Sequence, residues 1–173
     1  MNYRGWEHMS DEEKATLVPT SSMSFEKQVL ILRAYVVLTR MGVEPIQYKR
    51  VVTATRLART QISGVNSFFL GLGFLKKVEK GTYLPAKEVV EFYNEELGKE
   101  NYSALKPLVA GSTLYRRVSG MIMIHGSATK EEIIEYLLEE SGEKTGSRAG
   151  RALEWLEHAG LIAIGNSGDI RLL

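Results

Sequence analysis

The sequence predicts a mainly α-helical protein with small β-hairpins, because two distant stretches each combine a helical pattern, a glycine stop and a short hairpin. In the first stretch, apolar residues recur at helical spacing from Ile62 to Leu72. Gly73 can end that helix in a left-handed cap, and two short strands are expected around Lys80-Gly81. The second stretch has a helical pattern before Gly160 and a hairpin after it.

Composition limits the class of protein. The chain has 173 residues, of which 44% are hydrophobic and 25% charged, as in a water-soluble globular protein of one or two domains. It has no cysteine, no apolar signal sequence and no run of ~18 apolar residues, so we expect a cytoplasmic protein with no membrane contact. The three histidines, His8, His125 and His158, lack metal-ligand spacing, and we expect neither a metal site nor a cofactor.

The sequence of the first half predicts an arm, three helices and a hairpin. Residues 1–23 form the arm, where Ser10 begins a short helix that ends near Leu17, and Tyr3 and Trp6 are apolar anchors. A domain over 24–85 follows. Its first expected helix runs from Phe25 to Met41 and is capped by Ser24, and its second runs from Ile46 to Ala58 and is opened by Pro45. A turn at Arg59-Thr60-Gln61 leads to a third helix that reaches Leu72. A hairpin with strands at 74–79 and 82–84 follows.

The second half repeats the plan after a linker over 86–111. The linker should hold a helix from Ala86 to Leu97 with an acidic outer face and a connector interrupted by Pro107. A second domain over 112–173 then has expected helices at 112–124, 130–140 and 147–158 and a hairpin at 161–173, with a capping box at Thr129 and Glu132.

The two halves match at an offset of 87 residues. Gly73 falls on Gly160 and Gly81 on Gly168 at this offset. The apolar matches are Phe68 with Trp155, Phe69 with Leu156 and Val65 with Ala152. Two matched glycines and a matched apolar pattern at one offset indicate an internal duplication.

Two helices, a tight turn, a third helix and a hairpin make a helix-turn-helix with a β-wing. This pattern resembles the winged-helix superfamily, and is carried here by Phe69-Leu70-Gly71-Leu72-Gly73-Phe74-Leu75 and by residues 153–162. The chain looks most like the small prokaryotic and archaeal winged-helix transcriptional regulators. Tandem winged helices also occur in proteins that bind only other proteins, such as segregation and endosomal-sorting subunits.

Charge separates the two halves. From Ser24 to Lys87 there are eleven Lys and Arg against three acids, a net +8, whereas from Tyr102 to the end there are eight against nine, a net −1. Cations displace counterions from phosphates, so the first half is the expected nucleic-acid-binding half.

The candidate DNA-binding residues come from three places. The second helix and the turn after it supply Tyr48, Lys49, Arg50, Arg56 and Arg59, the exposed side of the third helix supplies Thr60, Gln61, Ser63, Asn66 and Ser67, and the wing supplies Lys76, Lys77 and Lys80. Gln and Asn can pair with adenine through two hydrogen bonds. The alternative is an ordinary solvated helix face.

In the second domain Lys144, Thr145, Ser147, Arg148 and Arg151 offer a second DNA contact, although the acidic helix before them would repel phosphates. The alternative is a surface for dimerisation or a protein partner.

We therefore predict a protein that binds double-stranded DNA, is not an enzyme, and regulates transcription as a homodimer. The third helix would enter the major groove, and a dimer would meet two half-sites ~10 bp apart or a multiple of that. The alternative function is a tandem winged-helix scaffold that binds proteins without touching DNA.

Overall fold

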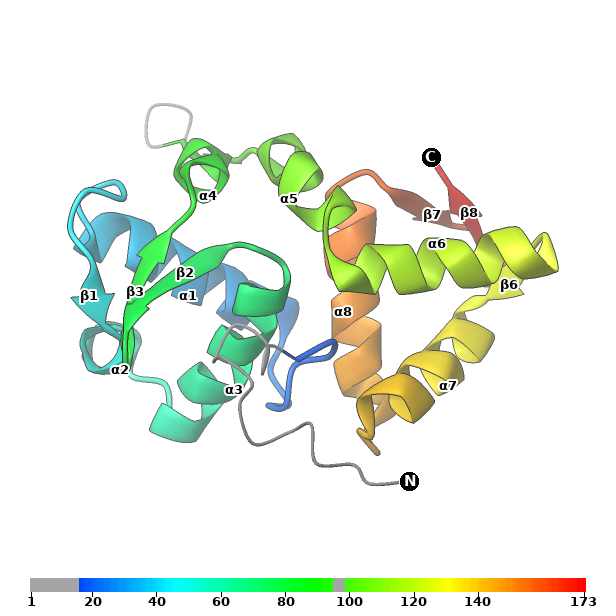
Figure 1. Ribbon diagram of the computed structural model, residues 1–173, viewed down its shortest axis with the longest axis horizontal. Coiled ribbons are helices and arrows are strands. Elements are labelled where there is room, and N and C mark those ends of the chain that lie inside the picture. Colours follow the sequence, from blue (N-terminus) through cyan, green and yellow to red (C-terminus); the bar gives the residue numbers. More distant parts are fainter. Residues whose placement is uncertain (1–15, 95–98) are drawn as a thin grey trace, which may run out of the picture.

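The computed structural model describes residues 16–94 and 99–173, and over these residues the chain is mainly helical with small antiparallel sheets (Figure 1). We define the first unit as the elements from α1 to β3. They are α1 (Phe25–Leu38), β1 (Ile46–Gln47), α2 (Tyr48–Thr55), α3 (Arg59–Gly71), β2 (Leu75–Glu79) and β3 (Thr82–Pro85).

The second unit runs from α6 to β8. Its elements are α6 (Thr113–His125), β6 (Ala128–Thr129), α7 (Lys130–Ser141), α8 (Gly146–His158), β7 (Ile162–Ile164) and β8 (Asp169–Leu172). The connection between the units contains α4 (Lys87–Phe92), β4 (Tyr93–Asn94), β5 (Lys99–Glu100), the 3-10 helix η1 (Tyr102–Leu105) and α5 (Lys106–Ala110). In Figure 1 the units lie side by side, and α4 and α5 bridge them along one edge.

Both units have the same order of elements and the same sheet topology. The strand orders are β1-β3-β2 and β6-β8-β7. Leu75 pairs with Pro85 in the first sheet, and Ile162 pairs with Leu172 in the second, so both partners are displaced by 87 residues. The bounds of α3 and α8 also differ by 87 residues at both ends. The offset found in the sequence therefore relates equivalent elements.

Several helix ends follow the local signals in the sequence. The Ser24 and Ser112 side chains accept hydrogen bonds from Lys27 N–H and Tyr115 N–H, at 3.4 and 3.2 Å. Thr129 and Glu132 form the expected capping box at the start of α7. The caps predicted at Ser24 and Thr129 are confirmed, whereas Ser112, predicted as the first residue of its helix, is the N-cap of α6.

The first two helices differ from prediction at their ends. Helix α1 ends at Leu38 and not at Met41, because the backbone is left-handed at Arg40 and Met41, with φ of 52° and 59°. The helix predicted from Ile46 starts only at Tyr48. Ile46 is buried and pairs with Tyr83 as the third strand of the sheet, so Pro45 leads into a strand and not into a helix.

Other boundaries also need correction. The third helix begins at Arg59, so the turn is the short stretch after Thr55 and not Arg59-Thr60-Gln61. Helix α4 ends at Phe92, because Tyr93 turns into a strand that pairs with Glu100. Pro107 lies in the first turn of α5 and does not interrupt a connector. The arm helix predicted from Ser10, with Tyr3 and Trp6, lies outside the described residues.

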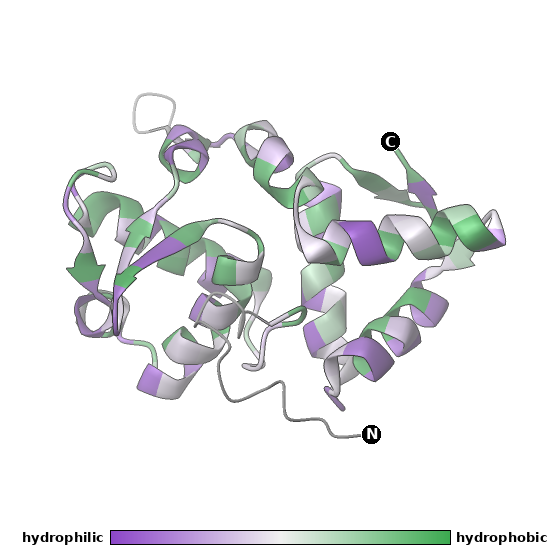
Figure 2. Cartoon of the chain, in the orientation of Figure 1, coloured by the Kyte–Doolittle hydropathy of each residue, from purple (hydrophilic) through white to green (hydrophobic). Residues whose placement is uncertain are grey.

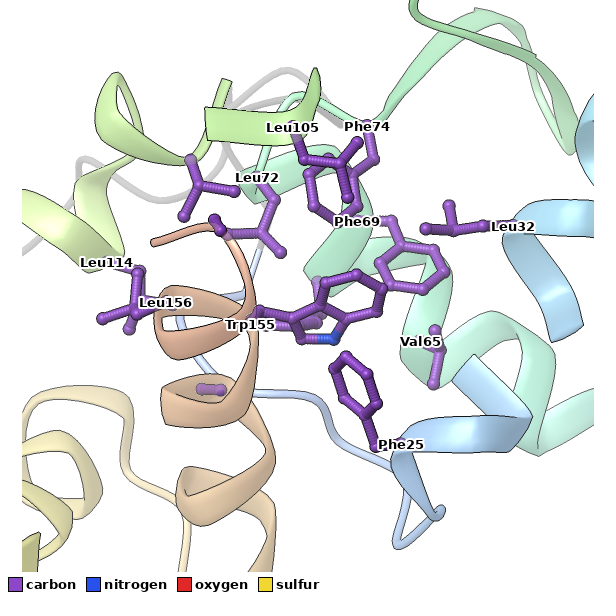
Figure 3. Packing of buried hydrophobic residues seen from close by; sticks show 14 of the residues in the cluster. Phe25, Leu32, Val65, Phe69, Leu72, Phe74, Leu105, Leu114, Trp155 and Leu156 are labelled. Carbon is purple, nitrogen blue, oxygen red and sulfur yellow. The ribbon is translucent and has the colours of Figure 1, made fainter. Parts of the chain in front are cut away.

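One hydrophobic core runs through both units (Figure 3). Trp155 of α8 is fully buried and its ring lies 4.6 Å from the Phe25 ring, 5.8 Å from Phe69 and 5.1 Å from Phe74, measured between centroids. Its Nε1 donates to Oε1 of Gln28 at 2.7 Å. A residue of the second unit therefore fills the core of the first, and the two units form one packed body.

The segment from Thr16 to Ser24 lies between α3 and α8 (Figure 1). Val18 is fully buried, and the N–H groups of Thr16 and Thr20 donate to the carbonyls of Ser67 and Gly64, at 3.2 and 3.5 Å. This part of the predicted arm is thus packed on the third helix.

Within the described residues, none of the helices has both the length and the apolar character needed to cross a bilayer.

Candidate nucleic-acid interface

The start of α2, the start of α3 and the turn of the β2–β3 hairpin meet at one place. The backbone fixes this meeting, because Tyr48 N–H donates to the Gly81 carbonyl at 2.9 Å. Between them lies a hollow of about 260 Å³, which we call the basic pocket. It is lined by Gln47, Tyr48, Lys49, Arg59, Lys80 and Gly81.

Three cations surround the basic pocket. Lys49, Arg59 and Lys80 are all exposed, and no ion pair with a carboxylate is found for any of them among the residues described. Arg59 Nε donates to the Tyr48 hydroxyl at 2.5 Å, and its guanidinium lies 5.6 Å from the Tyr48 ring centroid. The tyrosine therefore holds the arginine at the pocket.

The start of α2 adds to this positive field. Its N-cap residue, Gln47, makes no side-chain cap hydrogen bond, and the first turn contains no acid. The first amides of a helix carry partial positive charge and attract anions. The pocket therefore presents three full charges and a helix start to the same space, which suits a phosphate group.

The remaining predicted cations do not all join this cluster. Arg50 and Arg56 are exposed on α2 and at its end, where Arg56 adopts the left-handed conformation as the C-cap. Lys77 is half-buried. Lys76 lines a separate depression of about 580 Å³ that also contains Lys87, Glu88 and Glu91. The wing lysines Lys76 and Lys80 therefore line different hollows, and of the three only Lys80 lines the basic pocket.

The expectation that Asn66 lies on the exposed side of α3 is wrong. Only 2% of Asn66 is exposed, and its Nδ2 donates to the Tyr35 hydroxyl at 2.7 Å. Burial raises the pKa of Tyr35 well above its usual range, so the phenol stays neutral and available to accept. Asn66 is a core residue that joins α3 to α1.

The other polar residues of α3 remain near the surface. Thr60 and Ser63 are exposed, whereas Gln61 and Ser67 are half-buried. Gln61 Oε1 accepts from Ala58 N–H at 3.1 Å and so caps its own helix. Ser67 is occupied as well, since its hydroxyl donates to Ser63 O and its carbonyl accepts from Thr16 N–H.

Packing explains why a glycine, Gly64, lies in the middle of this helix. A Cβ atom at Gly64 would lie 2.7 Å from Oγ1 of Thr20 and 3.0 Å from Cβ of Ser21. Glycine allows the segment before α1 to lie directly on α3.

The second unit does not offer an equivalent cation cluster. Arg148 donates to the Ser22 hydroxyl at 3.1 Å and pairs with Glu143 at 2.8 Å, and Arg151 pairs with Glu154 at 2.5 Å. Both arginines thus have partners within the chain, and the possible second DNA contact at these residues stays a prediction. Lys144 and Ser147 are exposed, and Thr145 is the half-buried N-cap of α8.

The place equivalent to the basic pocket is acidic. Lys130 N–H donates to the Gly168 carbonyl at 2.8 Å, just as Tyr48 N–H donates to Gly81. The residues after Lys130 are Glu131 and Glu132, and Figure 2 shows hydrophilic residues along α7. The same backbone arrangement therefore carries opposite charge in the two units.

Two residues of the pocket were not foreseen from the sequence. Gln47 and Gly81 line it through their positions on β1 and in the hairpin turn. The Lys80-Gly81 pair was the signal for the turn, but nothing in the sequence showed that this turn meets the second helix.

The described residues contain no group of three or more His, Cys, Asp or Glu side chains that would hold a metal ion. Comparison with known proteins found no matching family model, curated protein or solved structure.

Proposed function

We propose that the first unit is a winged helix-turn-helix that binds duplex DNA, with a backbone phosphate in the basic pocket. The observation that carries this proposal is the convergence of Lys49, Arg59 and Lys80 at the start of α2, where the N-cap side chain of Gln47 makes no hydrogen bond to the helix. Phosphates gain affinity from such cations because condensed counterions are released, and helix starts add hydrogen-bond donors. The exposed Arg50 and Arg56 extend the same positive surface along α2.

We propose that the second unit is a second winged helix which supports the first and does not bind DNA. Its third helix, α8, inserts Trp155 into the first unit, and its equivalent of the basic pocket is acidic. Each chain would therefore offer one DNA contact. Binding to two half-sites then requires a homodimer, which remains a proposal together with a role in transcription regulation.

Binding of the full chain to fluorescent duplex DNA, measured against salt concentration, tests the proposal. Neutralising the pocket with Lys49→Gln, Arg59→Gln and Lys80→Gln should weaken binding about 10- to 100-fold near 0.1 M salt. It should also make the log–log salt slope shallower by about 1, at ~0.9 for the one phosphate held in the pocket.

A matched control neutralises three exposed cations elsewhere, with Lys106→Gln, Arg116→Gln and Arg171→Gln. This control changes the net charge equally but should weaken binding by less than about threefold, because those residues lie outside the first unit. Equal losses in the two variants, or no binding of the wild type at low salt, would contradict the proposal.

A protein-binding scaffold is the second candidate, and one observation favours it. Apolar side chains are exposed at the end of α1 and after it, with Val37 at 49%, Met41 at 42% and Val43 at 73%. Exposed apolar patches of this kind often mark protein contacts. A wild-type protein that fails to bind DNA would leave this function as the better one.

A further inference from the structure

The residues on α3 that face solvent are too few and too short to distinguish base pairs. Specific readout in the major groove depends mainly on side chains that make two hydrogen bonds to one base, Arg or Lys with guanine and Asn or Gln with adenine. Such a pair gives about 5- to 150-fold discrimination against the wrong base. Helix α3 contains three side chains of these types, Arg59, Gln61 and Asn66.

Both amide side chains already have hydrogen-bond partners within the chain. Asn66 is buried and donates to Tyr35 in the core. Gln61 is half-buried and uses its Oε1 to accept from Ala58 N–H, so its carbonyl already serves the start of α3. Pairing with adenine needs both the oxygen and the nitrogen of the amide, so Gln61 would have to share Oε1 between the base and its own helix cap.

Arg59 is directed elsewhere. Its Nε donates to the Tyr48 hydroxyl and its guanidinium lies against the Tyr48 ring, which places it in the lining of the basic pocket with Lys80. An arginine held between the second helix and the hairpin turn is placed for a phosphate.

What remains exposed is short. Thr60 and Ser63 are the exposed polar residues of α3 after Arg59, and the Ser63 hydroxyl donates to the Thr60 carbonyl at 3.2 Å. Serine and threonine pair with any base, so they select weakly. Next to them, the backbone of Thr20 and Ser21 lies on Gly64 and covers that side of the helix.

We infer that the first unit binds the phosphate backbone of duplex DNA and does not select a base sequence. This inference rests on the proposed function and adds the class of ligand, namely duplex DNA of any sequence. Phosphate contacts fix a protein on DNA but carry no sequence information directly. A regulatory role would then follow from occupancy of DNA and not from recognition of one operator.

The test is selection of duplexes of about 20 bp, two helical turns, from a randomised pool with the full chain, followed by affinity measurements on the enriched sequences. We expect no enriched sequence to bind more than about fivefold tighter than the starting pool. The Thr60→Ala/Ser63→Ala variant should change the affinity for every duplex by the same factor, and the Lys49→Gln/Arg59→Gln/Lys80→Gln variant should weaken all duplexes alike.

An enriched sequence that binds 50-fold tighter or more (about 2.3 kcal/mol) would overturn the inference but leave the proposed function intact. Loss of that preference in Thr60→Ala/Ser63→Ala would show that these hydroxyls read bases. Absence of binding to every duplex overturns the proposed function itself, and the two failures are therefore distinguishable.

Discussion

Replacing Gly64 with alanine should destabilise the protein, although the same change usually stabilises a helix. In a helix interior, Gly→Ala gains about 1 kcal/mol. At Gly64 the new Cβ would lie 2.7 Å from Oγ1 of Thr20, 3.0 Å from Cβ of Ser21 and 3.2 Å from its backbone nitrogen. The Thr20 hydroxyl can rotate away, but Ser21 can move only if the segment held by the Gly64 and Ser67 carbonyls lifts from α3.

Overpacking of this kind costs about 1–3 kcal/mol, which exceeds the gain in helix propensity. We therefore expect Gly64→Ala to lower the free energy of unfolding by about 1 kcal/mol net. Urea unfolding followed by far-UV circular dichroism measures the change as a shift of the midpoint at constant slope.

Gly120 provides the matched control. It also lies inside a helix, α6, and a Cβ at that position meets nothing within 4 Å. Gly120→Ala should raise the free energy of unfolding by about 1 kcal/mol, so the two variants should differ by about 2 kcal/mol. Equal stabilisation by both substitutions would refute the packing of residues 20–21 on α3.

Three further outcomes follow from the packing. Trp155→Ala should cost about 3–5 kcal/mol in urea unfolding, because the ring is fully buried and links both units. Burial raises the pKa of Tyr35 above the unfolded value of ~10, so the stability it contributes is present below pH ~10 and falls as pH rises further. Tyr35→Phe should flatten this alkaline decline in a series of unfolding curves, yet cost about 1–2 kcal/mol at neutral pH since Asn66 loses its acceptor. Thr129→Ala should cost about 1 kcal/mol by thermal unfolding, through loss of the capping hydrogen bond to Glu132 N–H.

The sequence predicted the elements whose signals are local. Ser24 and Thr129 mark helix starts because their side chains satisfy nearby amides, and Gly73 ends α3 with positive φ. The two-residue strands β1 and β6 were missed. Two residues show no periodicity, and their pairing partners Tyr83 and Ile170 lie far along the chain.

In the candidate site, too, features set by the local sequence were predictable and features set by distant contacts were not. The cations at the basic pocket were identifiable because charge distribution is visible in the sequence. The role of Asn66 was not, since it depends on Tyr35, 31 residues away, and a polar residue beside an apolar row looks exposed. The hydrogen bond that Arg148 donates to Ser22 was equally invisible in the sequence, because the two residues lie 126 positions apart. The position of Lys76 was predictable, because neighbouring residues of a strand point to opposite faces of the sheet and Leu75 is buried.

The hydrogen bond between Trp155 and Gln28 joins residues 127 positions apart, and this has a consequence for the order of folding. A chain synthesised from its N-terminus completes α1, α3 and the first sheet long before Trp155 exists. Until then the core of the first unit is incomplete, because the ring that packs against Phe25, Phe69 and Phe74 has not yet been synthesised. Contacts between residues this far apart in sequence form slowly, and we expect the three rings, while they lack Trp155, to favour aggregation or chaperone binding of nascent chains.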